Sequence, residues 1–182
     1  MNTEDLQQVA RADELLAIRC QLGERAAFDQ LIRQWAPPLR KYVQRVTNNH
    51  DASDDIMQEI WISVVRGVAG LQDCSKLRSW LFSIAHRTLM DRLRGQYSIS
   101  IDNNIELDEI VVENLEARRD EARQIVESGL SSLPLLEREV ISLFYLQELS
   151  LVEIATALTV PIGTIKSRLF RARIMLRDQI AH

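Results

Sequence analysis

Apolar residues recur every three or four positions through most of this chain, a spacing typical of amphipathic helices. Alternation of apolar and polar residues is nearly absent, so the pattern predicts an all-α fold. In the first fifty residues the apolar stripes comprise Leu15, Ile18 and Leu22, then Phe28, Leu31, Ile32 and Trp35, and then Leu39, Val43 and Val46. Pro37 and Pro38 stand between the last two stripes, which predicts a helix break or the first turn of a new helix.

Two further helices are expected before residue 95. The polar cluster TNNHD predicts a turn, after which Asp51 or Ser53 can cap a helix. The stripe of that helix comprises Ile56, Ile60, Trp61, Val64, Val65 and Val68. The segment AGLQDCSK predicts a loop, and the next helix is expected from about Ser79 to Arg94, with Trp80, Ile84 and Thr88 on one side.

The character of the chain changes near residue 96. Residues 100–127 contain nine acids and three arginines, and Gly, Ser and Asn cluster at the start of this stretch. Such a composition predicts a hinge followed by an acidic, weakly ordered connector, with helix from about Glu113. The negative charge of this connector either keeps the segment solvated or serves to bind a partner. The pattern therefore predicts two small helical domains, 1–95 and 119–182, joined by an acidic linker at 96–118.

Helical spacing returns after Leu133-Pro134, and the signals for helix ends are sharp. Ser150 precedes Glu153 by three residues, which is the spacing of a reciprocal capping box. The tripeptide TVP predicts a tight break, and Pro161 suits the first turn of a last helix that reaches about Ile180. Two short helices joined by three or four residues, the second of them basic, describe a helix-turn-helix.

The last helix concentrates positive charge in a chain whose formal net charge is -4. The segment VPIGTIKSRLFRAR carries four basic residues and no acid. Lys166, Phe170 and Arg173 share one strip of the helix, Ser167 and Arg171 share the next, and Ile165, Leu169 and Leu176 form an opposing apolar seam. This face suits the major groove of duplex DNA. A merely solvated helix would explain the charge, but such helices usually mix both signs.

A second basic segment extends from Lys76 to Arg94, where five basic residues accompany one acid. Aromatic side chains among basic ones can stack on unpaired bases. Trp80 shares a helical face with Ile84, which favours a core position, whereas Phe82 points elsewhere and is the freer candidate. Just before this segment, DASDDIMQE offers carboxylates. They fit helix capping and a protein-binding face better than a metal site, because no calcium-loop spacing is present.

Other features narrow the function further. No apolar run reaches the roughly 20 residues of a membrane helix, and no secretory signal is visible, so a cytoplasmic protein is expected. Cys20 and Cys74 predict reduced, buried thiols. No phosphate-binding glycine loop or nucleophile elbow appears, and His50, His86 and His182 stand isolated. We therefore expect no enzyme activity, no cofactor and no metal.

Two blocks of the chain resemble the extracytoplasmic-function (ECF) group of bacterial RNA polymerase sigma factors. DDIMQEIWISVV followed by LRSWLFSIAHRTLMDRLR is similar to conserved region two. LPLLEREVISLFYLQELSLVEIATALTVPIGTIKSRLFRARIMLRD is similar to region four. The order and spacing of the blocks make this resemblance specific, and together with GERAAFDQLIRQWAPPLRKYV it covers nearly the whole chain except the connector.

The resemblance implies partners and a role for each surface. The first block would dock on the clamp helices of the largest subunit of core RNA polymerase, through Asp54, Asp55, Gln58 and Glu59. The following segment would recognise and melt the minus-ten promoter element through Lys76, Arg78, Phe82 and Arg87. Region four would read the minus-thirty-five element through Thr164, Lys166, Ser167, Phe170 and Arg171. Family members are commonly inhibited by an anti-sigma factor, and one is expected here.

Some positions depart from the family pattern. Leu77 stands where Phe is frequent, Arg87 stands where an Asn often reads the melted strand, and Phe144 stands where an Arg often supports the upstream contact. Three alternatives stay open: a stand-alone helix-turn-helix repressor or activator, an enzyme, and a structural adaptor. Binding to core polymerase separates the sigma interpretation from the repressor, because only the former requires it.

Overall fold

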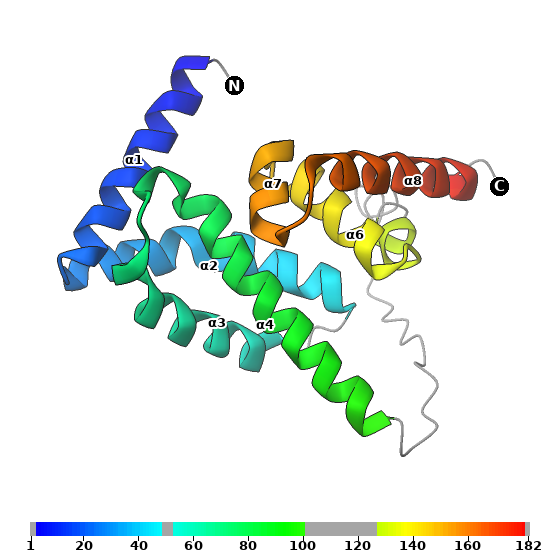
Figure 1. Ribbon diagram of the computed structural model, residues 1–182, viewed down its shortest axis with the longest axis horizontal. Helices are drawn as coiled ribbons and strands as arrows, with labels where there is room; N and C mark the ends of the chain where they lie inside the picture. Colours follow the sequence, from blue (N-terminus) through cyan, green and yellow to red (C-terminus); the bar gives the residue numbers. More distant parts are fainter. Residues whose placement is uncertain (1–2, 49–52, 101–126, 181–182) are drawn as a thin grey trace, which may run out of the picture.

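The computed structural model describes residues 3–48, 53–100 and 127–180, and within these ranges the regular structure is entirely helical (Figure 1). This confirms the all-α prediction. The α-helices are α1 (Thr3–Gln21), α2 (Arg25–Thr47), α3 (Ser53–Gly67), α4 (Leu77–Ser100), α6 (Leu135–Ile141), α7 (Leu151–Leu158) and α8 (Ile162–Ile180). Shorter turns are η1 (Val68–Gly70), η2 (Cys74–Lys76) and the π-type η3 (Ser142–Leu146). From residue 101 on, the predicted acidic linker lies outside the described residues.

Helices α1 to α4 form one unit, called here the N-terminal unit, and α1 packs on it with a face that the sequence analysis did not choose. Leu15, Ile18 and Leu22 are exposed, with 57%, 40% and 74% of their surface accessible. The neighbouring face of the helix, which includes Leu16 and Cys20, is buried instead. The stripe proposed for this helix was therefore wrong.

Helix α2 runs without interruption through Pro37 and Pro38, which corrects the predicted break. Each proline removes one backbone N–H and is costly inside a helix, on the order of 3 kcal/mol. The helix continues because its apolar stripe is buried on both sides of the pair. Leu31 and Trp35 lie before the prolines and Leu39 after them, all within the core.

Helices α6, α7 and α8 with η3 form the C-terminal unit, whose local signals matched the structure. The Ser150 hydroxyl accepts a hydrogen bond from the Glu153 backbone N–H, and the Glu153 carboxylate accepts from the Ser150 N–H, so the capping box is confirmed. Thr159 ends α7 in the left-handed conformation, with φ of 56°. A three-residue turn, 159–161, then leads into α8 as a helix-turn-helix requires.

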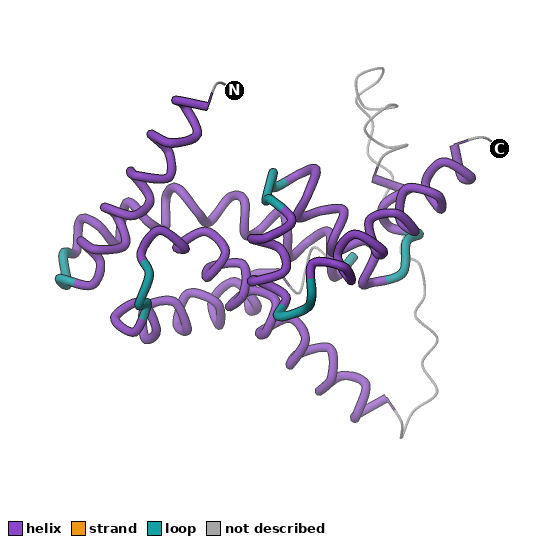
Figure 2. The backbone as a smooth tube through the Cα atoms, turned by 45° about the horizontal axis from the view of Figure 1, so that its top comes forward, coloured by secondary structure: helices purple, strands orange, loops and turns teal. Residues whose placement is uncertain are grey.

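The two units pack directly against each other. Helix α4 lies beside α7, and α2 lies beside α6 and η3. Figure 2 shows from a second direction that the described loops joining the helices are short and that the helices pack closely together. One continuous core joins the units, because buried side chains of both belong to a single cluster. None of the described helices combines the length and apolar character needed to cross a lipid bilayer.

Candidate functional site

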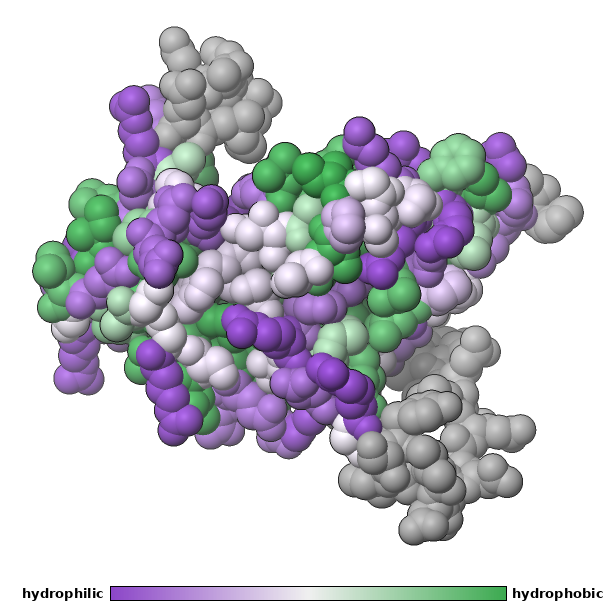
Figure 3. Space-filling view, in the orientation of Figure 1, coloured by the Kyte–Doolittle hydropathy of each residue, from purple (hydrophilic) through white to green (hydrophobic). Residues whose placement is uncertain are grey.

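The outer face of α8 is an exposed basic surface. Ile165 and Leu169 seat the helix on the core, as the seam predicted, while Lys166 and Ser167 are exposed and Phe170 keeps 64% of its surface accessible. The Ser167 hydroxyl donates to the Thr164 carbonyl at 2.9 Å. In Figure 3 an apolar area over α7 adjoins hydrophilic side chains along α8. The outer face of α8 is therefore charged and carries one exposed aromatic ring, that of Phe170.

Two arginines on α8 are held in place by neighbours that the sequence analysis missed. An Arg171 guanidinium nitrogen lies 2.9 Å from a carboxylate oxygen of Glu137, whose side chain is only 9% exposed. The Arg173 guanidinium lies over the rings of Tyr145 and Phe144, 5.5 Å and 6.0 Å from their centroids. Such cation–π contacts restrict an arginine without neutralising it. Phe144 thus supports a basic side chain of α8.

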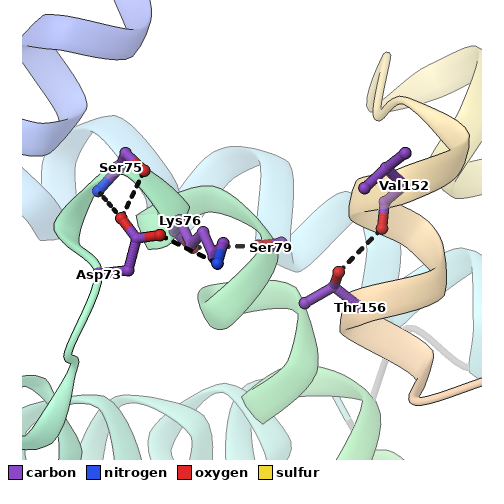
Figure 4. A network of polar contacts seen from close by, with 6 residues as sticks. All are labelled: Asp73, Ser75, Lys76, Ser79, Val152 and Thr156. Atoms are coloured by element: carbon purple, nitrogen blue, oxygen red, sulfur yellow. Dashed lines mark hydrogen bonds and ion pairs between the residues drawn. The ribbon is translucent and has the colours of Figure 1, made fainter.

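The start of α4 is shaped by a small polar network (Figure 4). Asp73 accepts hydrogen bonds from the Ser75 backbone N–H at 3.2 Å and the Ser75 hydroxyl at 2.5 Å. The Lys76 ammonium lies 2.9 Å from Asp73, and these contacts hold the pKa of Asp73 below its ordinary value. Lys76 remains exposed, so its charge is available but already has one partner.

The remaining minus-ten candidates lie in unlike surroundings. Phe82 is buried, and its ring packs edge-on against Trp35 and Tyr42 with centroids 6.4 Å and 5.4 Å away, so the expectation that Phe82 is free to stack on a base is corrected. Arg78 donates to the backbone carbonyl of Gln147 in the C-terminal unit. Arg87 alone of these three is exposed.

Trp80 is half-buried and approaches Gly67 at the end of α3. A Cβ atom at position 67 would lie 3.2 Å from the Trp80 ring, so the absence of a side chain there permits the close packing. This placement agrees with the core position favoured for Trp80.

The acidic residues of α3 lie on an exposed face bordered by two arginines. Asp54 pairs with Arg40 of α2, and Arg92 of α4 lies 3.4 Å from Asp55 and 3.2 Å from Glu59. Gln58 is exposed beside them. Within the described ranges no three metal-ligating side chains converge. Asp54, Asp55, Gln58 and Glu59 thus form an exposed polar face on α3.

A buried carboxylate joins the two units, and sequence reasoning did not find it. Glu139 of α6 is fully buried. Its Oε1 accepts a hydrogen bond from the Tyr42 hydroxyl at 2.5 Å, and His86 Nδ1 lies 2.7 Å from the same oxygen. Burial, and then the charge of Glu139, raise the pKa of Tyr42 well above its ordinary value. His86 is therefore not isolated, whereas His50 and His182 lie outside the described residues.

Comparison with known proteins decides the family. Residues 31–98 match the family model for Sigma-70 region 2, and residues 123–176 match that for Sigma-70, region 4. The ECF RNA polymerase sigma-E factor of Escherichia coli K12 is 30% identical over 182 residues, spanning 92% of this chain and 94% of that protein. The chain belongs to the ECF RNA polymerase sigma factors. It is a transcription initiation factor that directs polymerase to promoters.

Further relatives agree with this assignment. The ECF sigma factor SigW of Bacillus subtilis is 28% identical over 171 residues, which is 87% of this chain and 91% of SigW. Two solved structures share the fold of this sigma factor. CnrH, in complex with the cytosolic domain of CnrY, gives a TM-score of 0.70 at 24% identity, covering 93% of this chain and 97% of that one. RpoE of Bartonella quintana, in complex with the anti-sigma factor NepR, gives 0.75 at 23% identity, covering 85% and 96%.

Proposed function

We propose that this sigma factor binds core RNA polymerase with the acidic face of α3 and contacts the promoter with two separate basic surfaces. The observation that carries the proposal is the exposed face of α8, which bears positive charge on a capped helix-turn-helix. The domains that we propose are 1–95 and 119–182, and the described part of α4 continues beyond the first of them to Ser100.

The minus-thirty-five element is assigned to α8. Thr164, Lys166 and Ser167 lie in its first turns, the part of a recognition helix that usually reaches base edges. Phe170 adds an apolar contact suited to a thymine methyl. Arg171 and Arg173, already oriented by Glu137 and by the two rings, suit phosphate contacts that set the position of the helix.

The minus-ten element is assigned to the start and middle of α4. Lys76 and Arg87 are exposed and suit the phosphates and bases of a melted strand. Arg78 can contribute once it leaves the Gln147 carbonyl. Phe82 is withdrawn from base stacking in the arrangement described here, and its packing on Trp35 supports a role in the core.

The polymerase surface is assigned to Asp54, Asp55, Gln58 and Glu59, which would meet the clamp helices of the largest subunit. Their exposure supports this assignment, since buried acids could not reach a partner. Arg40 and Arg92 orient the three carboxylates without covering them. The protein acts in the cytoplasm with polymerase and itself performs no catalysis.

An anti-sigma factor is the further partner that we propose. One structural relative, RpoE, was solved in complex with the anti-sigma factor NepR, and another, CnrH, was solved in complex with the cytosolic domain of CnrY. In this chain an apolar pocket of about 260 Å³, walled by Tyr145, Leu146 and Leu176 among others, offers a place for an apolar side chain of such a partner. Its recovery with the sigma factor from cells would support this.

Run-off transcription tests the central proposal. Purified core polymerase with the full chain is expected to start at defined sites on a library of genomic fragments, and polymerase alone is not. Asp54→Asn with Glu59→Gln should abolish these starts and also co-elution with polymerase. Failure of the folded wild-type chain to bind core polymerase would favour the repressor or the adaptor instead.

A further inference from the structure

We propose that the Glu139 cluster (Tyr42, His86 and Glu139) is an intramolecular lock that holds the two units together in a closed form unable to span a promoter. The proposal rests on the proposed function, because it concerns when the two DNA surfaces can act. It adds a conformational step, opening, that must precede engagement of both promoter elements.

The cluster joins three helices through one oxygen atom. Tyr42 comes from α2, His86 from α4 and Glu139 from α6, so both donors belong to the N-terminal unit and the acceptor to the C-terminal unit. Hydrogen bonds to a charged acceptor are stronger than neutral ones. Because Glu139 is fully buried, removing a donor leaves its charge undercompensated where water cannot reach it.

Two contacts at other points reinforce the closure. Arg78 of α4 donates to the backbone carbonyl of Gln147, just after η3. The Asn48 side-chain amide, at the end of α2, donates to the Ser131 carbonyl at 3.1 Å. All of these bonds cross between the units and do not stabilise either unit by itself. They therefore affect the equilibrium between closed and open forms more than the folding of each unit.

The closed form conflicts with simultaneous binding of two promoter elements. One turn of duplex is about 34–36 Å long, so elements separated by roughly two turns lie about 70 Å apart. In this structure α7 packs against α4, which brings the two DNA-binding units into contact. Arg78, assigned to the minus-ten element, is at the same time occupied by the C-terminal unit. Opening is required for both reasons.

Closure also predicts a measurable cost for polymerase binding. When only a fraction of the molecules is open, the apparent affinity of a partner selective for the open form falls by that fraction. A partner that separates the units therefore works against the Glu139 cluster. Substitutions that weaken the cluster should strengthen binding of polymerase, the opposite of what a merely damaged fold would do.

Tyr42→Phe and Glu139→Gln in the full chain test the lock. Both retain the shape of the side chain, and neither residue belongs to the surfaces assigned to DNA or polymerase. Small-angle X-ray scattering should show a larger radius of gyration for each variant. Titration with core polymerase should show about fivefold tighter binding or more, the scale of a typical coupling between sites. Asp178→Asn, which removes an exposed carboxylate at the far end of α8, should change neither quantity.

Far-UV circular dichroism identifies variants that fail to fold, and the milder Tyr42→Phe keeps the test valid if Glu139→Gln unfolds. An unchanged radius of gyration in a folded variant overturns the lock. If wild type binds polymerase, an increased radius with unchanged or weaker polymerase binding in the variant also overturns the lock. If wild type binds polymerase and the variants stay compact, only the lock fails. If the variants open while no form binds polymerase, the proposed function fails.

Discussion

The two basic surfaces of this sigma factor have similar residues and unlike surroundings. The face of α8 projects into solvent, with its arginines steadied by a carboxylate and two rings from the same unit. The surface of α4 is partly engaged: Lys76 pairs with Asp73, Arg78 reaches into the other unit, and Phe82 is buried. Under the proposed function, the α8 surface is open to DNA, and the α4 surface becomes complete only when the units separate. The distribution of charge along a sequence thus indicates candidate DNA-binding surfaces, but it does not show whether those side chains are exposed or engaged by other parts of the protein.

The largest expected effect comes from destroying the open surface of α8 while keeping that of α4. Ile165→Asp places a carboxylate in a fully buried seam, at a cost of about 3 kcal/mol or more. The C-terminal unit should melt at a much lower temperature, and binding of an upstream-element duplex should be lost. Ile162→Asp, at an exposed position of the same helix, should melt nearly as wild type does. Equal melting of both variants would contradict the predicted seat of α8.

A smaller loss is expected from removing one charge of the ready surface. Arg171→Ala should weaken binding of the upstream duplex by about 1 kcal/mol and lower the salt slope by about one unit. Footprints and titrations at several salt concentrations measure both. Arg177→Ala near the end of α8 is the matched control, with a smaller effect expected. An unchanged slope for Arg171→Ala would argue against a phosphate contact.

Glu137→Gln sharpens the role of the carboxylate that steadies Arg171. Removal of a negative charge beside the DNA face should steepen the salt slope by up to about one unit and strengthen binding to random duplex. Promoter preference should fall, since Arg171 loses its fixed partner. Competition between promoter and random duplex measures that preference. A promoter preference equal to or above that of wild type would show that Glu137 only weakens DNA binding.

The smallest effect is expected at the turn before α4. The pKa of Asp73 is lowered by its bonds to Ser75 and Lys76, so its stabilising contribution is present above the unfolded pKa and lost as pH falls through the folded value. Asp73→Asn should therefore lower the melting temperature slightly at pH 7, and the difference from wild type should vanish in acid. Melting curves between pH 7 and pH 2 measure this. A difference that grows in acid would exclude the Asp73 bonds as its source.

Features set by local chemistry were predictable from the sequence. The Ser150–Glu153 capping box and the buried seam of α8 depend on residues within a few positions of each other, so spacing alone identifies them. The exposed basic face opposite Ile165 follows from the same periodicity. Family blocks added the order of the units, which the structure bears out as two helical groups.

Features set by distant neighbours were not predictable. Apolar residues occupy two faces of α1, and only packing decides that Leu16 is buried and Leu15 is not. In α2, the free energy gained by burying the apolar stripe exceeds the cost of placing two prolines inside the helix. Phe82 looked free because its partners, Trp35 among them, stand some forty residues earlier. The bond between His86 and Glu139 spans 53 positions, and no spacing rule connects a histidine and a glutamate over that distance.

The absorbance of Tyr42 can report whether the two units are together, because its phenol is buried between them. While the units stay together, proton loss from this ring is postponed far into the alkaline range. On the proposed opening, the Tyr42 hydroxyl loses its contact with Glu139, and its pKa should move back toward the value of about 10 of an ordinary tyrosine. Absorbance of tyrosinate, followed through an alkaline titration with and without polymerase, would then report the fraction of separated molecules without any attached dye.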